Sequence, residues 1–126
     1  MKNTKVTVGS KVGLLKQEVI NTLKVNLLPA EIYLLMGGIK HIRNKRQTCF
    51  KNHLNEIPEI IKNPEYIGTN PRYPNSVEFL KEIRGINVLV AISINSQKVL
   101  QVSTMYTVTS SKLATMIEHN RMKKLK

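Results

Sequence analysis

Residues 87–108 constrain the fold of this chain more than any other segment does. Every second residue from 88 to 94 is Val or Ile, which is the period of a strand with one buried face. The polar residues 95–97 predict a hairpin loop, and residues 98–108 predict a long return strand. Because two strands joined by a short loop pair antiparallel, we expect the C-terminal half to build an antiparallel sheet.

The segments on either side of this hairpin predict the rest of the architecture. Residue periodicity predicts helices over 12–28, 35–46, 54–62 and after 109, and strands over 31–34, 66–68 and 76–83. The expected fold class is therefore α+β, with N-terminal helices packed on one face of a C-terminal antiparallel β-sheet and a short C-terminal helix. The other face of the sheet would then be free to hold a site.

Length and charge limit the domain organisation and the partners. The chain has 126 residues, which fits a single domain over 11–126 after a polar segment, 1–10, that is either disordered or a short edge strand. Lys and Arg number 20 against 8 acidic residues, all of them Glu, for a net charge of +12. Such an excess is typical of a protein with a polyanionic partner, most often nucleic acid. The alternative is an anionic membrane surface, but no long basic amphipathic helix is visible.

Several features are missing from the sequence, and their absence shapes the expected chemistry. Residues 1–11 are polar and basic with no apolar segment after them, so we expect no signal peptide, no membrane anchor and a soluble cytoplasmic protein. Cys49 is the only cysteine, which excludes an internal disulfide and disfavours a thiolate-rich zinc site. The chain has no Asp and no Glu and His at metal-ligand spacing, so we expect no metal and no cofactor.

The densest group of chemically useful side chains lies between residues 40 and 53, with five Lys and Arg, two His and no acid. A histidine titrates near neutral pH, which suits His41 to proton transfer, although it can also be a boundary residue packed beside Ile42. His53 fits a solvated position better than a functional one. The basic side chains can contact phosphates or form a solvated helix face, but an ordinary exposed face mixes both signs of charge. They are Arg43, Lys45, Arg46 and Lys51.

Cleavage of RNA needs little from a protein, because the substrate carries its own nucleophile, the 2′-OH. An enzyme supplies a base for that hydroxyl, an acid for the 5′-oxygen leaving group and cations for the phosphorane. Arg46 lies on the apolar stripe of its predicted helix and so points toward a cleft, where its planar guanidinium suits a phosphorane.

Five short motifs follow one another along residues 30–121. They are His41-Ile42 with a basic helix after it, IPEIIKNPEYIG at 57–68, SVEFLK at 76–81, VLVAI at 88–92 and VSTMY at 102–106. As a set they resemble the phage-associated nuclease families of the barnase–EndoU–colicin–RelE superfamily. The resemblance implies an α+β fold, metal-independent RNA cleavage and an origin in phage or other mobile elements.

The resemblance also implies roles for particular residues. His41 matches the helix histidine of these families, Lys81 matches the basic residue that closes the 76–81 strand, and Thr104 and Tyr106 match a polar pair. The residues themselves leave alternatives, since Lys81 can snorkel at the sheet edge and strand parity groups Thr104 and Tyr106 with the core. These families often carry a second histidine near positions 46 and 47, and this chain has none there.

The sequence therefore predicts a toxin-like, metal-independent endoribonuclease that leaves a 2′,3′-cyclic phosphate. In this prediction His41 is the acid or base, Lys81 and Arg46 stabilise the transition state, and Thr104 and Tyr106 position the phosphate or relay a proton.

Three further expectations concern partners and alternatives. The substrate would be RNA, such as tRNA or mRNA, with Arg121 and the basic tail after it either on the RNA backbone or simply solvated. An antitoxin or immunity protein is a candidate partner. The alternative function is a non-catalytic nucleic-acid binder, or an inhibitor of a host nucleic-acid enzyme, on the same fold. A DNA-binding regulator is a third class, without a helix-turn-helix signature to support it.

Overall fold

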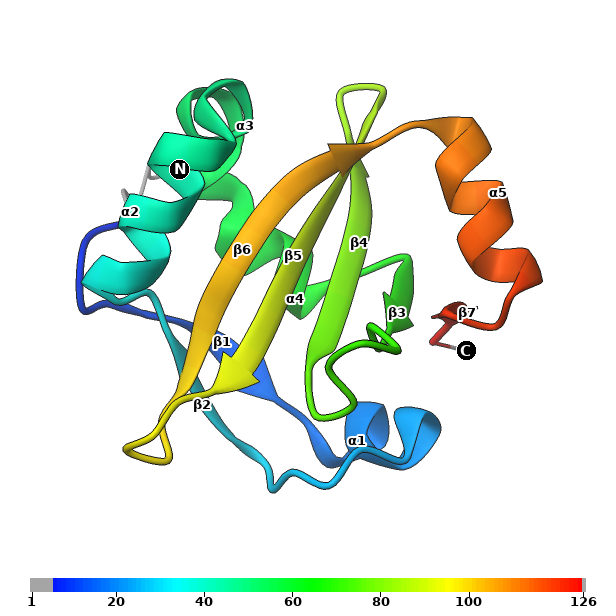
Figure 1. The fold of residues 1–126 in the computed structure, drawn as a ribbon, viewed down its shortest axis with the longest axis horizontal. Helices are drawn as coiled ribbons and strands as arrows, with labels where there is room; N and C mark the ends of the chain where they lie inside the picture. The colour runs from blue at the N-terminus through cyan, green and yellow to red at the C-terminus, as the bar shows by residue number, and fades with distance from the viewer. Residues whose placement is uncertain (1–5, 126) are drawn as a thin grey trace.

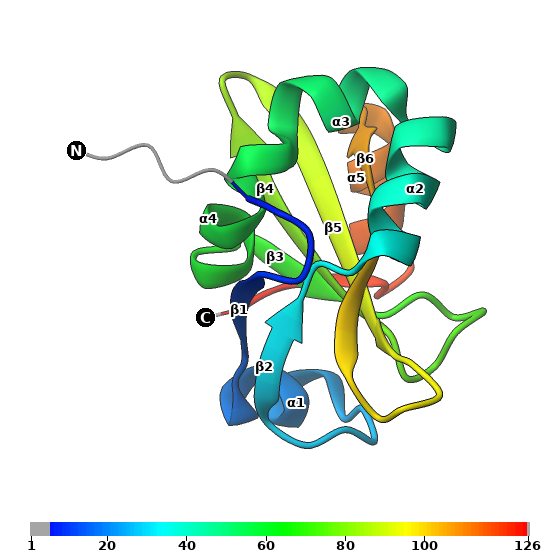
Figure 2. The ribbon, with the colours of Figure 1, turned by 90° about the vertical axis from the view of Figure 1, so that its left-hand side faces the viewer.

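A seven-stranded mixed sheet forms the centre of the fold. The computed structural model describes residues 6–125, and the strand order is β1-β2-β6-β5-β4-β3-β7 (Figures 1 and 2). The strands are β1 (Lys11–Leu15), β2 (Ala30–Tyr33), β3 (Tyr66–Gly68), β4 (Val77–Ile83), β5 (Ile86–Ile94), β6 (Leu100–Val108) and β7 (Met122–Lys124). The helices are α1 (Gln17–Leu23), α2 (Met36–Lys45), α3 (Gln47–His53), α4 (Ile57–Lys62) and α5 (Ser110–Glu118), and a 3-10 turn, Leu54–Glu56, joins α3 to α4. The predicted α+β class is confirmed.

The predicted C-terminal meander is confirmed, because β3, β4 and β5 each pair antiparallel with the next strand along the chain. The sheet is nevertheless mixed rather than purely antiparallel. The N-terminal strand β2 adds to the outer edge of β6 in parallel, with Ile32 beside Leu100, and both of these side chains are buried. A sheet edge with unpaired backbone groups gains a hydrogen-bonding partner in this way.

The main core lies between the sheet and the helices α1 to α4. Ile57, Ile60 and Ile61 of α4 pack with Phe79 of β4 and Val90 of β5, and all five side chains are at most 3% exposed. Burial of this size is the principal favourable term in folding, at roughly 1.5–3 kcal/mol for each large apolar side chain. In Figure 1, α4 lies behind the central strands while α2 and α3 stand beside the β6 side of the sheet.

The sequence suggested that the opposite face of the sheet is free, but part of this face is covered. Leu80, Leu89 and Val108 form a second, smaller cluster with Met116 of α5 and Met122 of β7. The terminal helix therefore covers one end of this face. The remainder of the face, between α2 and α5, stays open toward the viewer (Figure 1).

The two ends of the chain differ from the prediction. Residues 12–15, the start of the segment expected to be helical, belong to β1 instead, because pairing with β2 buries Val12 and Leu15. Of the polar segment 1–10, residues 1–5 lie outside the described part of the chain. Residues 6–10 form a turn that two backbone hydrogen bonds hold to Leu34. At the other end, the basic tail was expected either to contact the RNA backbone or to be solvated, and no strand was predicted there. Residues 122–124 form β7, which pairs with β3 and buries Met122.

Candidate functional site

A β-bulge in β6 decides which side chains face the open side of the sheet. Thr104 pairs with Ala91 whereas Val102 pairs with the next residue of β5, so Ser103 is an extra residue in β6. One extra residue reverses the alternation of side chains along a strand. Strand parity grouped Thr104 and Tyr106 with the core, but the bulge turns both of them to the open face.

The open face carries a pocket of about 530 Å³. The pocket lies beside the loop that joins β3 to β4, and residues far apart in the sequence meet in it. Those with functional side chains include His41 of α2, Arg72 and Tyr73 of the loop, Glu78 of β4, and Thr104 and Tyr106 of β6. The structure therefore brings together three of the residues that the sequence nominated, His41, Thr104 and Tyr106.

Helix α2 carries His41 to the pocket, and Gly38 allows the helix to lie this close to β6. A Cβ atom at position 38 would stand only 2.3 Å from the backbone oxygen of Val102, so no other residue fits without a shift. The neighbouring Gly37 has open space around it. About one helical turn after Gly38, His41 is exposed and lines the pocket.

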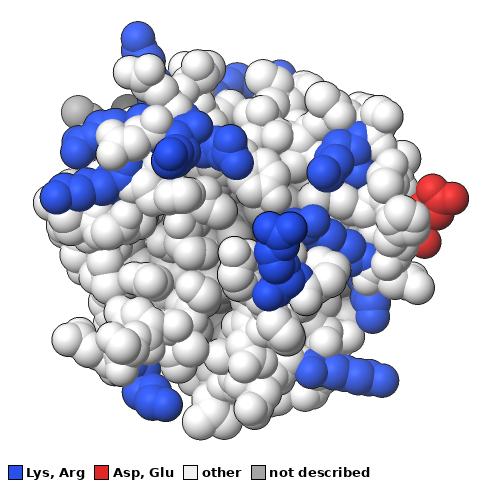
Figure 3. All heavy atoms as spheres, in the orientation of Figure 1, with Lys and Arg blue, Asp and Glu red and all other residues white. Residues whose placement is uncertain are grey.

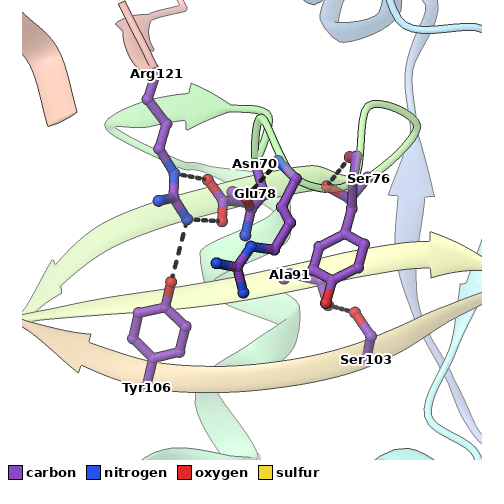
Figure 4. Close-up of polar contacts among 9 residues, drawn as sticks. Asn70, Ser76, Glu78, Ala91, Ser103, Tyr106 and Arg121 are labelled. Carbon is purple, nitrogen blue, oxygen red and sulfur yellow. Dashed lines mark hydrogen bonds and ion pairs between the residues drawn. The ribbon is translucent and has the colours of Figure 1, made fainter. Parts of the chain in front are cut away.

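A buried ion pair borders the pocket next to Tyr106 (Figure 4). Arg121 donates from Nε to Oε1 of Glu78 at 3.0 Å and from Nη2 to Oε2 at 2.6 Å, and the same Nη2 lies 3.4 Å from the Tyr106 hydroxyl. Glu78 is only 1% exposed, so its charge is balanced by Arg121 rather than by water. The hydrogen bond to Glu78 raises the pKa of Arg121 above its ordinary value, which keeps the guanidinium charged.

Two hydroxyl groups in the pocket are free to donate to an anion. Burial, and then the charge of Glu78, raise the pKa of Tyr106 by more than Arg121 and Arg46 lower it, so its hydroxyl stays protonated at neutral pH. That oxygen accepts from Arg121, which leaves its own hydrogen for a ligand. Thr104 Oγ1 is buried without a hydrogen-bond partner among residues 6–125, which is rare in folded proteins, so its hydroxyl hydrogen is uncommitted.

Arg46 also reaches Tyr106, but not inside the pocket that His41 lines. Its guanidinium carbon lies 5.1 Å from the centroid of the tyrosine ring, the geometry of a cation–π contact. Arg46 lines an adjacent hollow of about 420 Å³ together with Lys112 of α5. Tyr106 lines both spaces and separates the two arginines, Arg46 and Arg121.

Backbone hydrogen bonds fix the loop that overhangs the pocket. Tyr73 N–H donates to Asn70 O at 2.8 Å, and Ser76 donates to Tyr73 O from both its N–H and its hydroxyl. Asn70 Oδ1 also accepts from the N–H of Arg72 at 2.9 Å. The side chains of Arg72 and Tyr73 remain exposed, so a rigid turn presents a cation and an aromatic ring at the pocket.

The surface around the pocket is basic. Figure 3 shows Lys and Arg side chains over the region of α2 and α3 and near the centre of this face, whereas acidic atoms appear only at one edge. Arg43, Lys45 and Lys51, which the sequence nominated for RNA binding, are exposed on α2 and α3. Their charges enlarge the field that an incoming polyanion meets.

Two other nominated residues lie outside this site. Lys81 is on the core-facing side of β4, where Nζ donates to Asn63 O at 3.1 Å and lies 3.9 Å from Glu59 Oε2. This is the snorkelling arrangement that the sequence left open. His53 is neither solvated nor near the pocket, since it is 3% exposed and its Nδ1 lies 2.8 Å from Glu56 Oε1.

Glu78 is the main functional residue that the sequence analysis missed. It stands in β4 between Val77 and Phe79 and before Leu80, and a carboxylate in such an apolar strand signals a buried partner. The partner, Arg121, is 43 residues away, and the sequence suggested for it only a place on the RNA backbone or in solvent. No local pattern connects the two.

Among residues 6–125, no three His, Cys, Asp or Glu side chains gather closely enough to hold a metal ion. No helix in that range has the length and the apolar character needed to cross a membrane.

Comparison with known proteins shows that the chain matches the profile of one protein family. The profile of the family described as "phage-Barnase-EndoU-ColicinE5/D-RelE like nuclease3" matches residues 10–115. No curated protein and no solved structure matches the chain. The matched range includes His41, Arg46, Glu78, Thr104 and Tyr106, and it ends before Arg121.

Proposed function

The chain belongs to the phage Barnase-EndoU-ColicinE5/D-RelE like nuclease family, and on that premise we propose that it is a metal-independent endoribonuclease that leaves a 2′,3′-cyclic phosphate. The observation that carries the proposal is the convergence of His41, Thr104 and Tyr106 in one basic pocket on the open face of the sheet. A nuclease of this family acts on nucleic acid, and the net charge of +12 suits such a substrate.

In the proposed reaction the 2′-oxygen of the substrate forms a bond to phosphorus while the bond from phosphorus to the 5′-oxygen breaks. His41 carries out one of the two proton transfers and water carries out the other. Either His41 removes the proton of the 2′-OH and water protonates the leaving 5′-oxygen, or water accepts the first proton and His41 delivers the second. Its exposure at the pocket gives it access to both oxygens, and an imidazole near neutral pH can act in either direction.

The remaining side chains stabilise negative charge on the phosphoryl oxygens. The hydroxyls of Tyr106 and Thr104 donate hydrogen bonds to those oxygens, because both have a hydrogen that the protein does not use. Arg121 is a positioning residue that orients the Tyr106 hydroxyl, and Glu78 holds Arg121 in place. Arg72 adds positive charge at the pocket. Lys81 has no role in this proposal, because its side chain points to the other face of the sheet.

The wider setting is part of the same proposal. The protein acts as a toxin-like nuclease of a phage or mobile element on cytoplasmic RNA such as tRNA or mRNA. An antitoxin or immunity protein restrains it. An acidic partner would complement the basic face that surrounds the pocket (Figure 3).

The decisive experiment incubates purified protein with total RNA in EDTA and maps the product ends. We expect cuts with 2′,3′-cyclic phosphate ends, and His41→Ala should lower the rate by roughly 10²–10⁴-fold. His119→Ala is the matched control, because that histidine is exposed at the end of α5 and does not line the pocket. A substrate with a 2′-deoxy nucleotide at a mapped cut should resist cleavage there, because the nucleophile is gone. Equal cleavage by wild type and His41→Ala would refute the assignment of His41.

One observation favours the alternative of a non-catalytic binder or inhibitor. His41 is the only one of the three histidines that lines the pocket, and His53 is committed to Glu56, so no second imidazole is at hand. Tight RNA binding without cleavage, unchanged in His41→Ala, would establish that alternative.

A further inference from the structure

The hollow on the Arg46 side of Tyr106 has the composition of an anion site. Arg46 from the α2–α3 junction and Lys112 from α5 both line it, together with the hydroxyl-bearing residues Thr48 and Thr107. No acidic residue is among its lining residues. Cations from two separate elements thus face one space of about 420 Å³.

The charge in this hollow is not balanced by the protein itself. Among residues 6–125, neither Arg46 nor Lys112 forms a salt bridge, whereas Arg121 on the other side of Tyr106 is paired with Glu78. Two like charges that share a concave surface repel each other, and an anion between them removes that repulsion. Threonine hydroxyls supply further donors for anionic oxygens.

The hollow also adjoins the proposed active site, since the Tyr106 side chain lines both spaces. The Tyr106 ring has Arg121 at its hydroxyl and the Arg46 guanidinium 5.1 Å from its centroid. A nucleic-acid strand whose phosphate lies at the Tyr106 hydroxyl would bring the neighbouring phosphate past the ring to the Arg46 side. Successive phosphates of one strand are therefore the anions best matched to the two spaces.

We propose that this hollow is a second phosphate subsite, which holds the phosphate next to the scissile one through Arg46 and Lys112. The inference rests on the proposed ribonuclease function, because only that function makes one of the two phosphates the cleaved one. The binding of two adjacent phosphates can be measured without any cleavage. Lys112 is the better residue to test, because Arg46 also contacts Tyr106 and its loss would disturb the active site.

The test uses isothermal titration calorimetry with nucleoside 3′,5′-bisphosphates and the matching 3′-monophosphates of all four nucleosides. For the nucleoside that binds best, wild type should favour the bisphosphate by at least about tenfold, because charge-assisted contacts add to the second phosphate. Lys112→Ala should reduce this ratio severalfold. Lys16→Ala is the matched control, since Lys16 is exposed before α1 and lines neither space, and it should keep the wild-type ratio.

The outcomes separate this inference from the proposed function. A bisphosphate preference that Lys112→Ala loses and Lys16→Ala keeps supports the subsite, even if no RNA is cut and the ribonuclease proposal fails. RNA cleavage that depends on His41 without a bisphosphate preference overturns the subsite and leaves the ribonuclease proposal standing. Equal losses in both lysine variants would show a general charge effect and overturn the subsite as well.

Discussion

Gly38 connects the packing of the fold to the position of His41, the proposed catalytic histidine, and replacing Gly38 by alanine tests both the packing and the proposal. The added Cβ would lie 2.3 Å from the backbone oxygen of Val102, while ordinary contact begins near 3.4 Å, so α2 must move away from β6 by about 1 Å. Val102 pairs with Ile92 of β5, and the residue before it, Gln101, pairs with β2, so the backbone of β6 does not give way easily here. The helix has to move instead.

The expected loss can be worked from two opposing effects. Overpacking a close contact costs about 1–3 kcal/mol, and replacing glycine by alanine in a helix returns about 0.5–1 kcal/mol. The midpoints of the two ranges leave a net loss of about 1 kcal/mol for Gly38→Ala, with about 2.5 kcal/mol as the upper limit. A displacement of about 1 Å at a catalytic group can cost as much as about 10²-fold in rate, and His41 stands on the same helix, so RNA cleavage should fall as well.

Gly37→Ala is the matched control for this prediction. Position 37 has no neighbouring atom within 4 Å of an added Cβ, so the same substitution should stabilise the helix by a few tenths of a kcal/mol, up to about 1. Urea denaturation gives the stability of each variant, and cleavage of one RNA substrate gives the activity. If Gly38→Ala were as stable and as active as Gly37→Ala, the tight packing of α2 on β6 would be refuted as the reason for this glycine.

Two further predictions concern the interior. Glu78→Gln should cost about 2–4 kcal/mol of stability in urea denaturation, because it leaves the Arg121 charge unbalanced in a largely buried site. A double-mutant cycle with Arg121→Met should show strong coupling, and simple additivity of the two single losses would contradict the ion pair. Burial raises the pKa of the Cys49 thiol to about 11, so the folded protein keeps a proton that the unfolded chain loses near pH 9. The contribution of the protonated thiol to the free energy of unfolding is present in full below about pH 9 and is lost as the pH rises through 11. Between pH 9 and 11, Cys49→Ala should therefore lose less stability than the wild type. Parallel stability curves for the two proteins would refute this.

Local signals in the sequence predicted those elements that local physics controls. The alternation of Val and Ile over 88–94 gave β5, and the same hairpin gave β6. A helix was predicted after residue 109, and Thr109 caps it, since its Oγ1 accepts from Lys112 N–H at 3.0 Å. The helical period over 35–46 gave α2 and put His41 on it, at the edge between core and solvent.

Long-range pairing explains why other elements could not be predicted. Residues 11–15 become a strand because β2 is available beside them, and their own periodicity is equally compatible with a helix. Arg121 lies next to Glu78 because β3 pairs with β4 on one side and with β7 on the other. No spacing in the sequence encodes this contact between residues 43 positions apart.

The sequence by itself determined the chemistry that is available: a strongly basic chain, one histidine on a basic helix, and a polar Thr and Tyr in a long strand. Only the tertiary structure decided which of these groups meet. A strand's period separates its side chains into two sets without saying which set is buried, and one extra residue, Ser103, reverses the assignment for Thr104 and Tyr106. Lys81 lies on the face of the sheet opposite the pocket, because the helices that pack on β4 decide which of its two faces is the core face.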